Sequence, residues 1–217
     1  EAAADAGADA IKLQTYTADT LTFDSDSAEF RVDGTIWEGK TLYQLYQEAS
    51  LPWAWHKPLM DHARNLGLLA FSTPFDATAI EFLESLDVPA YKIASSELVD
   101  IPLIRRVAGL GKSMIISTGM GTLSEIDEAV QTARAAGCDQ IILLKCTAAY
   151  PAPIDEANLA TLPHMAQLFG TVVGLSDHTP GSIAPVAATV LGGCVIEKHL
   201  TLSRADGGPD SAFSMEP

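Results

Sequence analysis

Positive charge is scarce in this sequence, which has 13 Lys and Arg residues against 28 Asp and Glu residues and a formal net charge of −15. Nucleic acids and anionic membrane surfaces are bound through positive faces, so this balance argues against either as a general partner. No apolar run approaches the roughly 18 residues that a membrane-spanning helix needs. Any anionic ligand must therefore meet a few cations that are placed locally.

Cysteine is scarce as well. Cys138, Cys146 and Cys194 each lie in small or apolar segments, without the close pairs of a zinc site or a disulfide framework. We interpret them as reduced thiols of the core, which is the usual state of cysteine in the cytosol. A cytoplasmic location is the corresponding expectation.

A repeated unit organises the rest of the chain, whose 217 residues and 47% hydrophobic content suffice for one sizeable core. After Gly7, a short apolar run is followed by a polar or glycine-containing loop and then by an amphipathic stretch. One helix is predicted at 76–86, and Thr122 with Glu125 forms a capping box that opens another helix ending at Gly137. Such alternation predicts an α/β fold with a parallel sheet. Seven strands are predicted, at 10–14, 68–73, 90–95, 113–118, 140–146, 172–177 and 195–200.

The ends of these strands favour a TIM (β/α)8 barrel over a doubly wound open sheet. Nearly every strand ends in polar residues, and a barrel brings all of these ends to one mouth. An open sheet would spread them along a line, with a shared site only near its switch point. Residues 1–7 have the pattern of a helix end stopped by glycine, and residues 208–217 that of a loop. We therefore expect 1–217 to be an incomplete, truncated barrel domain that holds strands two to eight, with strand one outside it.

The segment 15–66 interrupts the repeated unit, because about 50 residues separate the first two predicted strands. Its stretches 30–46 and 51–56 are rich in Trp and Tyr. Long insertions at the active mouth of a barrel often bind substrate. Two interpretations stay open: the insertion recognises a substrate, or its aromatic side chains cap the barrel.

Two histidines follow neighbouring strands, His178 after 172–177 and His199 within 195–200. Imidazole suits divalent transition metals, and two histidines leave coordination positions for water and substrate oxygens. Either histidine alone would more often be structural, but the pair at adjacent strand ends predicts a metal site. Because alternate residues of a strand share a face, the side chain of Ser176 should lie on the same face as that of His178. Glu197 should likewise lie on the same face as His199.

Lysines lie in other strands, where a charge needs a partner. Lys12, Lys92 and Lys145 are embedded in apolar runs, and in an acidic protein their economical partner is a bound anion. The alternative is that some of them pair with nearby carboxylates, namely Glu97, Glu197 or Asp177. A lysine that forms a Schiff base is a further alternative, although the histidine pair weighs against it. Hydroxyl donors at Thr73, Ser95, Ser117 and Ser176 complete a predicted site for a small phosphorylated carboxylate.

Short motifs run in order along essentially the whole chain, at Ala10–Thr15, Phe71–Phe75, Tyr91–Glu97, Ser117–Met120, Leu144–Thr147, Tyr150–Pro153, Gly174–Thr179, Ile196–His199 and Gly207–Asp210. In this order they resemble the barrel of the N-acetylneuraminate (sialic acid) synthase family. The resemblance implies an enzyme, a transferase that condenses phosphoenolpyruvate with an N-acetylated amino-sugar aldehyde to give a nonulosonic acid and phosphate. Stretches 35–46 and 51–56 resemble the branch that makes pseudaminate from 2,4-diacetamido-2,4,6-trideoxy-altrose.

Other acceptors stay open within the same resemblance, namely those that lead to N-acetylneuraminate or legionaminate. A more distant alternative is another phosphoenolpyruvate-dependent 3-deoxy sugar acid synthase. Such enzymes accept phosphorylated sugars and should carry an extra Arg and Lys cluster at the mouth. Arg105, Arg106 and Arg134 fall instead within predicted helices, which counts against that alternative.

The resemblance also implies roles for particular residues. His178 and His199 would bind Mn²⁺, with Mg²⁺ or Co²⁺ as substitutes, and Glu97 would act with them in catalysis. Glu97 and Asp210 would bind the open-chain sugar, while Tyr150 and Gln14 would line the site. Ala148 departs from the family, which often has a polar side chain there. Phosphoenolpyruvate would be held by Lys12, Thr73, Lys92, Ser95, Ser117 and Ser176.

For Glu197 the only ground is the face that it shares with His199, which places it among the substrate-binding candidates. The family's usual glutamate after strand one and its C-terminal antifreeze-like domain would lie outside this chain. In the family, that domain reaches into the partner's active site, so the full-length protein is expected to be a homodimer.

Overall fold

The computed structural model describes residues 1–217, and its centre is a single parallel sheet of seven strands. All seven predicted strands are confirmed, with bounds that shift by a few residues. Three are shorter at their carboxyl ends than predicted, so Ser95, Thr118 and His199 lie just beyond their strands. The strands are β1 (Ala10–Thr15), β2 (Leu69–Pro74), β3 (Ala90–Ile93), β4 (Ser113–Ser117), β5 (Ile141–Cys146), β6 (Val172–Asp177) and β7 (Val195–Lys198).

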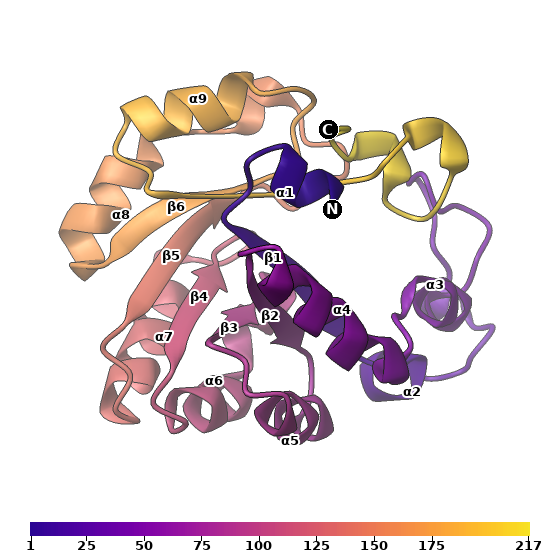
Figure 1. Ribbon diagram of the computed structural model, residues 1–217, viewed down its shortest axis with the longest axis horizontal. Coiled ribbons are helices and arrows are strands. Elements are labelled where there is room, and N and C mark those ends of the chain that lie inside the picture. Colours follow the sequence, from indigo (N-terminus) through magenta and orange to yellow (C-terminus); the bar gives the residue numbers. More distant parts are fainter.

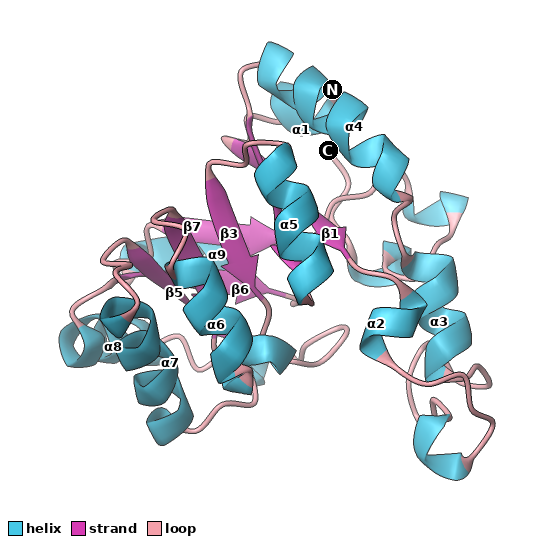
Figure 2. Cartoon of the chain, turned by 90° about the horizontal axis from the view of Figure 1, so that it is seen from below, coloured by secondary structure: helices cyan, strands magenta, loops and turns pink.

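The strands lie side by side in chain order, from β1 at one edge to β7 at the other. A doubly wound sheet reverses its strand order at a switch point, and this sheet has no such reversal. The sheet curls into an open half-barrel with helices on its outer side (Figures 1 and 2). The predicted α/β class is confirmed.

Five helices follow strands β2 to β6 in turn and cover the outer side. The two helices predicted from local patterns are confirmed: Asp76 caps α5 through two backbone amides, and Thr122 with Glu125 forms the capping box of α7. Arg105 and Arg106 lie in α6, as predicted. The five are α5 (Ala77–Ser85), α6 (Ile101–Ala108), α7 (Leu123–Ala135), α8 (Thr161–Phe169) and α9 (Ile183–Val190).

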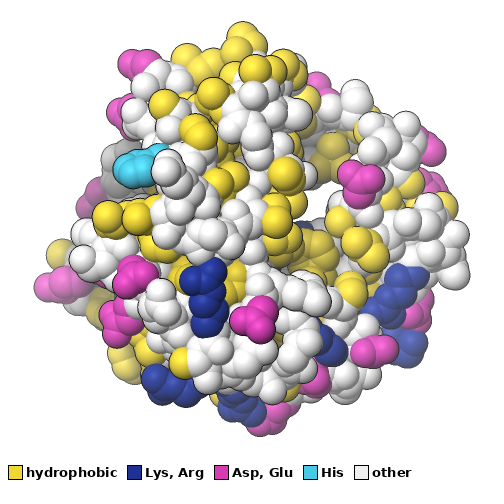
Figure 3. Space-filling view, turned by 90° about the vertical axis from the view of Figure 1, so that its left-hand side faces the viewer, with side chains coloured by type: hydrophobic (Ala, Val, Ile, Leu, Met, Phe, Trp, Pro, Cys, Tyr) yellow, Lys and Arg dark blue, Asp and Glu magenta, His cyan; other side chains and the backbone are white.

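The helix α9 carries no charged residue, and Ile183, Val186 and Val190 on it are exposed. Apolar side chains gather at the top of the face seen in Figure 3, where α9 lies. No helix combines the length and the apolar character that crossing a membrane requires.

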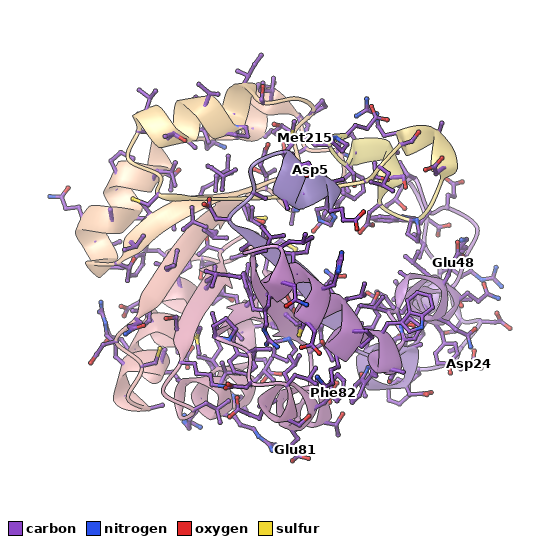
Figure 4. All side chains as sticks on the ribbon, viewed as in Figure 1. Asp5, Asp24, Glu48, Glu81, Phe82 and Met215 are labelled. Carbon is purple, nitrogen blue, oxygen red and sulfur yellow. The ribbon has the colours of Figure 1, made fainter.

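The segment between β1 and β2 has two parts. Its last helix, α4 (Trp53–Asn65), packs against β1 and β2 and is the ordinary crossover between them. The remainder, residues 16–52, is the true excursion. It contains α2 (Ala18–Leu21), the 3₁₀ helix η1 (Ala28–Phe30) and α3 (Leu42–Ala49). Figure 4 labels Asp24 and Glu48, two acidic residues of this excursion.

Shorter helices complete the structure. At the start, α1 (Ala2–Asp5) is followed by Gly7 at φ +83°, which agrees with the predicted glycine stop. Four 3₁₀ helices lie after strands or in the C-terminal segment: η2 (Ser96–Val99), η3 (Ile154–Glu156), η4 (Arg204–Asp206) and η5 (Ser211–Phe213).

Strands β6 and β7 approach each other closely at Gly174. A Cβ atom there would lie 2.1 Å from the carbonyl oxygen of Val195 and 2.8 Å from the side chain of Leu144. Only glycine therefore permits the register that pairs Ser176 with Glu197. This register also sets where the two histidines emerge.

We expect Gly174→Ala to lower the free energy of unfolding by about 1–3 kcal/mol, because the β7 backbone must move to admit the methyl group. Urea denaturation followed by circular dichroism measures this. Gly109→Ala is the matched control, since a Cβ at Gly109 meets nothing closer than 3.5 Å and its φ is −65°. Equal stability of the two variants would contradict the close approach.

Candidate functional site

Two lysines and one glutamate form the centre of the site on the inner face of the sheet. The Nζ atoms of Lys12 on β1 and Lys92 on β3 lie 3.0 and 3.5 Å from the same oxygen, Oε1 of Glu197 on β7. Lys92 also donates to the hydroxyl of Ser117 at 2.7 Å, and Ser176 donates to Glu197 at 2.9 Å. The curl of the sheet thus joins residues from both of its edges.

Lys12 and Lys92 thus have the carboxylate partner that one of the two alternatives predicts, and the binding of an anion stays a prediction. Both pair with Glu197, although one carboxylate neutralises only one of two ammonium groups. The cluster therefore keeps one surplus positive charge. Lys92 is only 2% exposed, so water does little to screen that surplus. A further anion would compensate it.

The same geometry explains two pKa shifts. Burial alone would raise the pKa of Glu197, but the ammonium groups of Lys12 and Lys92 lower it to about 2. Burial, opposed by the charge of Glu197 and assisted by that of Lys12, lowers the pKa of Lys92 to about 8. Glu197 is thus ionised at neutral pH, while Lys92 is held in its charged form less firmly than an exposed lysine.

The lowered pKa of Glu197 predicts that the unfolding free energy decreases in acid. Glu197 has a folded-state pKa of about 2 and an ordinary value of 4.5, so its ionisation stabilises the fold fully above about pH 5 and not below about pH 2. We expect the difference in unfolding free energy between the wild type and Glu197→Gln to shrink as the pH falls through this range. Urea denaturation at several pH values measures it. A difference that stays constant from pH 5 to 2 would contradict the assignment.

The other predicted hydroxyls lie around this cluster. Thr73 on β2 is 1% exposed, and its hydroxyl has no hydrogen-bond partner. Gln14 is its register partner on β1. Ser95, just after β3, accepts a hydrogen bond from the backbone amide of Gly119 at 3.0 Å. Thr73 thus has a buried hydroxyl with an unused donor.

The two histidines lie next to each other, with ring centroids 5.5 Å apart. Nδ1 of His178 is 2.9 Å from the carbonyl oxygen of Thr147 and must carry a proton to donate to it. Nδ1 of His199 is 3.3 Å from Oδ2 of Asp210. Both rings therefore turn Nδ1 toward protein oxygens and keep Nε2 as the free nitrogen, which is how metal-ligating histidines are commonly oriented.

The chain offers these two imidazoles without a third protein ligand, since no group of three or more His, Cys, Asp or Glu residues is arranged to hold a metal. Two neutral imidazoles fit a divalent transition ion whose remaining positions are filled by water or substrate oxygens. The residues present are thus compatible with the predicted two-histidine site.

An aromatic wall stands beside the histidines. The ring of Tyr150 lies 4.2 Å from that of His178, and the ring of Phe213 lies 5.1 Å from that of His199. Trp37, from the excursion, contacts both Tyr150 and Phe213. The wall covers one side of the histidine pair with rings from three distant parts of the sequence.

Glu97 begins the loop after β3, in η2. Burial raises the pKa of its carboxyl group, although a hydrogen bond from Ser96 and the charge of Lys92 oppose this. Burial raises the pKa of Tyr46 on α3, and the negative charge of Glu97 raises it further. Glu97 therefore lies close enough to the excursion to influence Tyr46, and its raised pKa makes it easier to protonate than an exposed carboxylate.

The sequence profile of the NeuB family matches residues 1–217, which is the whole chain. The chain belongs to the NeuB family. Two curated NeuB relatives are the pseudaminic acid synthases of Helicobacter pylori, 47% identical over 212 residues, and of Campylobacter jejuni serotype O:23/36, 44% identical over 216 residues. The alignments cover 98% and 100% of this chain but only 62% and 63% of those relatives. The chain thus spans less than two thirds of their length.

Two further comparisons place the chain within the NeuB family. The N,N'-diacetyllegionaminic acid synthase of Campylobacter jejuni serotype O:2 is 39% identical over 220 residues, covering 100% of this chain and 66% of the relative. The crystal structure of N-acetylneuraminic acid synthetase from Leptospira borgpetersenii superposes with a TM-score of 0.87 at 30% identity. That alignment covers 99% of this chain and 70% of the other.

One predicted anion ligand of this NeuB chain faces elsewhere. Lys145 does not join Lys12 and Lys92; its ammonium group donates to Thr147 and the carbonyl oxygen of Glu156. It lines a cavity of about 560 Å³ against α7 and α8, on the outer side of the sheet. Alternation along β5 explains this, because Lys145 precedes an inward-facing residue, Cys146.

Sequence reasoning also missed three contributors to the NeuB site. Cys146 had been interpreted as a core thiol, but its sulfur lies 3.9 Å from Nδ1 of His178. Burial raises the pKa of this thiol, yet hydrogen bonds with His178, Ser95 and Ser176 lower it overall. Phe213 has no role in the sequence analysis, and Trp37 is included only as part of the aromatic stretch 30–46. The period-two pattern of β5 could have revealed Cys146, whereas no local pattern marks Phe213.

Proposed function

We propose that this protein condenses phosphoenolpyruvate with an N-acetylated amino-sugar aldehyde to give a nonulosonic acid and phosphate. The preferred acceptor is 2,4-diacetamido-2,4,6-trideoxy-altrose, and the product is pseudaminate. One observation carries the proposal: Glu197 and Ser176 join a cluster with surplus positive charge directly to the strands that end in the histidine pair. An anion site and an imidazole pair on adjacent strand ends are what this reaction needs. The 47% identity to a pseudaminic acid synthase supports the choice of acceptor.

The histidine pair would hold a divalent ion, Mn²⁺ by preference and Mg²⁺ or Co²⁺ as substitutes. Such an ion would polarise the aldehyde oxygen and stabilise the alkoxide that forms from it. Asp210 and Thr147 orient the two rings from behind.

The chain's own residues bind and orient the substrates. Lys12 and Lys92 would hold the phosphate and carboxylate groups of phosphoenolpyruvate, whose charge compensates the surplus of the cluster. Donors for these oxygens would come from Thr73, Ser95, Ser117 and Ser176.

The acceptor would lie between the histidine pair and the excursion, bound by Glu97 and Asp210 and lined by Tyr150 and Gln14. C3 of phosphoenolpyruvate forms a bond to the aldehyde carbon, water adds at C2, and the C2–O bond to phosphate breaks. With its raised pKa, Glu97 is the residue suited to move a proton in these steps.

The wider setting follows from the same proposal. We infer that residues 1–217 form the larger part of a (β/α)8 barrel, in which one more strand would pair with β7 and β1. We also infer a homodimer, as expected from the family resemblance, and a cytoplasmic location. All three cysteines are free thiols, which supports a reducing compartment.

Phosphate release from phosphoenolpyruvate in the presence of Mn²⁺ tests the proposal. The acceptors compared are the altrose-configured diacetamido sugar, the diacetamido precursor of legionaminate, N-acetylmannosamine and none. The Helicobacter pylori relative is the positive control. Release that requires the altrose sugar supports the proposal. Release with another acceptor keeps the condensation and overturns the acceptor, while no release under conditions where the control works overturns the function.

A further inference from the structure

Trp37 links the excursion to the C-terminal segment. Its indole Nε1 donates to the carbonyl oxygen of Pro209 at 2.7 Å, across 172 residues of sequence. Its ring centroid lies 5.8 Å from that of Tyr150 and 6.4 Å from that of Phe213. In Figure 1 the loop between η1 and α3 reaches up to the yellow C-terminal segment, where this contact is made.

The acceptor of this hydrogen bond directly precedes a residue that orients a histidine. Pro209 is followed by Asp210, whose carboxylate lies 3.3 Å from Nδ1 of His199. The two rings that Trp37 contacts are the ones that contact the histidines: Tyr150 lies against His178, and Phe213 against His199. Trp37 therefore contacts the residue before Asp210 and both aromatic rings that lie against the histidines.

The C-terminal segment has other anchors, but they lie at its end or within it. The amide of Met215, labelled in Figure 4, donates to the carbonyl oxygen of His199 at 2.8 Å. Ser214 donates to the carbonyl oxygen of Asp210 at 2.7 Å. These bonds shape the segment and fix its return to β7. The side chain of Trp37 supplies the hydrogen bond that ties Pro209 to the excursion.

The excursion itself presents Trp37 on a folded turn. The amide of Val32 donates to the carbonyl oxygen of Lys40 at 2.9 Å, and Gly39 donates back to Val32 at 3.2 Å. The amide of Trp37 donates to the hydroxyl of Thr35 at 3.2 Å. The backbone that carries Trp37 is thus ordered by hydrogen bonds within the excursion, as a positioning contact requires.

We propose that Trp37 is a positioning residue for the histidine pair: it holds the Pro209–Asp210 peptide and the aromatic wall, and through them sets the orientation of His199 for metal binding. This rests on the proposed function, because it takes the histidine pair as the metal site. Partners behind metal-ligating histidines typically change metal affinity by about 10- to 100-fold. Trp37 acts one step further away.

The test compares four variants of the whole chain. Trp37→Phe keeps a ring and removes the N–H donor, and Trp37→Ala removes both. Trp55→Phe and Trp55→Ala are matched controls, since Trp55 lies on α4, is 58% exposed and makes no ring contact. The readouts are the Kd for Mn²⁺, measured by electron paramagnetic resonance of the free ion, and the Kd for inorganic phosphate, measured by calorimetry. The third readout is the ¹⁵N signals of the His199 ring in metal-free protein.

We expect the Kd for Mn²⁺ to rise about 3-fold in Trp37→Phe and about 10-fold in Trp37→Ala, and to stay unchanged in both Trp55 variants. Phosphate binding should be unaltered throughout, because Trp37 contacts neither Lys12 nor Lys92. The His199 ring signals should shift in Trp37→Ala and not in Trp55→Ala.

Three results would overturn the proposal: equal Mn²⁺ affinity in the Trp37 and Trp55 variants, a parallel loss of Mn²⁺ and phosphate binding that indicates general damage, or unchanged His199 signals in Trp37→Ala. The NMR readout needs no metal. If the unsubstituted chain binds no Mn²⁺, the proposed metal site fails, and the His199 signals still decide whether Trp37 positions the ring.

Discussion

Replacing either His178 or His199 with alanine is expected to abolish Mn²⁺ binding and to lower phosphate release at least about 1,000-fold. The reason is that a metal held by only two protein ligands loses half of them with one substitution. The stabilisation of an alkoxide by such an ion is worth several kcal/mol, and each 1.4 kcal/mol is about tenfold in rate. The fold should survive, because both residues follow the ends of their strands and belong to neither β6 nor β7.

The control for this prediction is His164→Ala. His164 is an exposed histidine on α8 and lines the cavity on the outer side of the sheet. Metal binding is measured by calorimetry and phosphate release by a coupled assay. If His178→Ala still binds Mn²⁺ as tightly as His164→Ala does, the ion is held elsewhere and the histidine pair is not the metal site.

Replacing Glu197 with glutamine is expected to cost about 3–5 kcal/mol of unfolding free energy in phosphate-free buffer. Two ammonium groups now share one carboxylate oxygen, and the amide would leave both uncompensated in a place where Lys92 has almost no contact with water. Inorganic phosphate should restore much of this loss, because it supplies the missing negative charge. The same concentration should stabilise the wild type less.

Urea denaturation with and without phosphate measures both effects. Glu84→Gln is the matched control, since Glu84 pairs with Lys112 at 2.8 Å in a more exposed position and should lose no more than about 1 kcal/mol. If Glu197→Gln is as stable as Glu84→Gln and gains nothing from phosphate, the cluster carries no surplus charge that an anion can compensate.

The fold was largely predictable because its signals are local. Each strand is a short apolar run, and the caps at Asp76 and Thr122 are formed by neighbours within three residues. The proximity of His178 and His199 was predictable for a related reason, since they follow consecutive strands of a parallel sheet. The aromatic wall was not predictable, because Trp37, Tyr150 and Phe213 meet only through tertiary packing.

The partners of the lysines show a different limit. A buried ammonium group needs a negatively charged partner. The sequence alone does not tell whether that partner is a bound anion or a nearby carboxylate. Only the curl of the sheet shows that Glu197 at one edge reaches Lys12 at the other. The orientation of Lys145 could have been predicted from the alternation of side chains along β5, because Lys145 and its neighbour Cys146 point to opposite faces of the sheet.

The anion cluster and the histidine pair both depend on the docking of strand β7. It is four residues long, pairs only with β6, and supplies Glu197 while leading directly into His199. Until it docks, Lys12 and Lys92 have no carboxylate between them, and His178 has no second imidazole. Segments with few buried side chains open at a lower free energy than the whole domain, and no residue of β7 is fully buried. Release of this one strand would therefore dismantle the anion cluster and the histidine pair together, and a ligand bound to either would slow hydrogen exchange along β7.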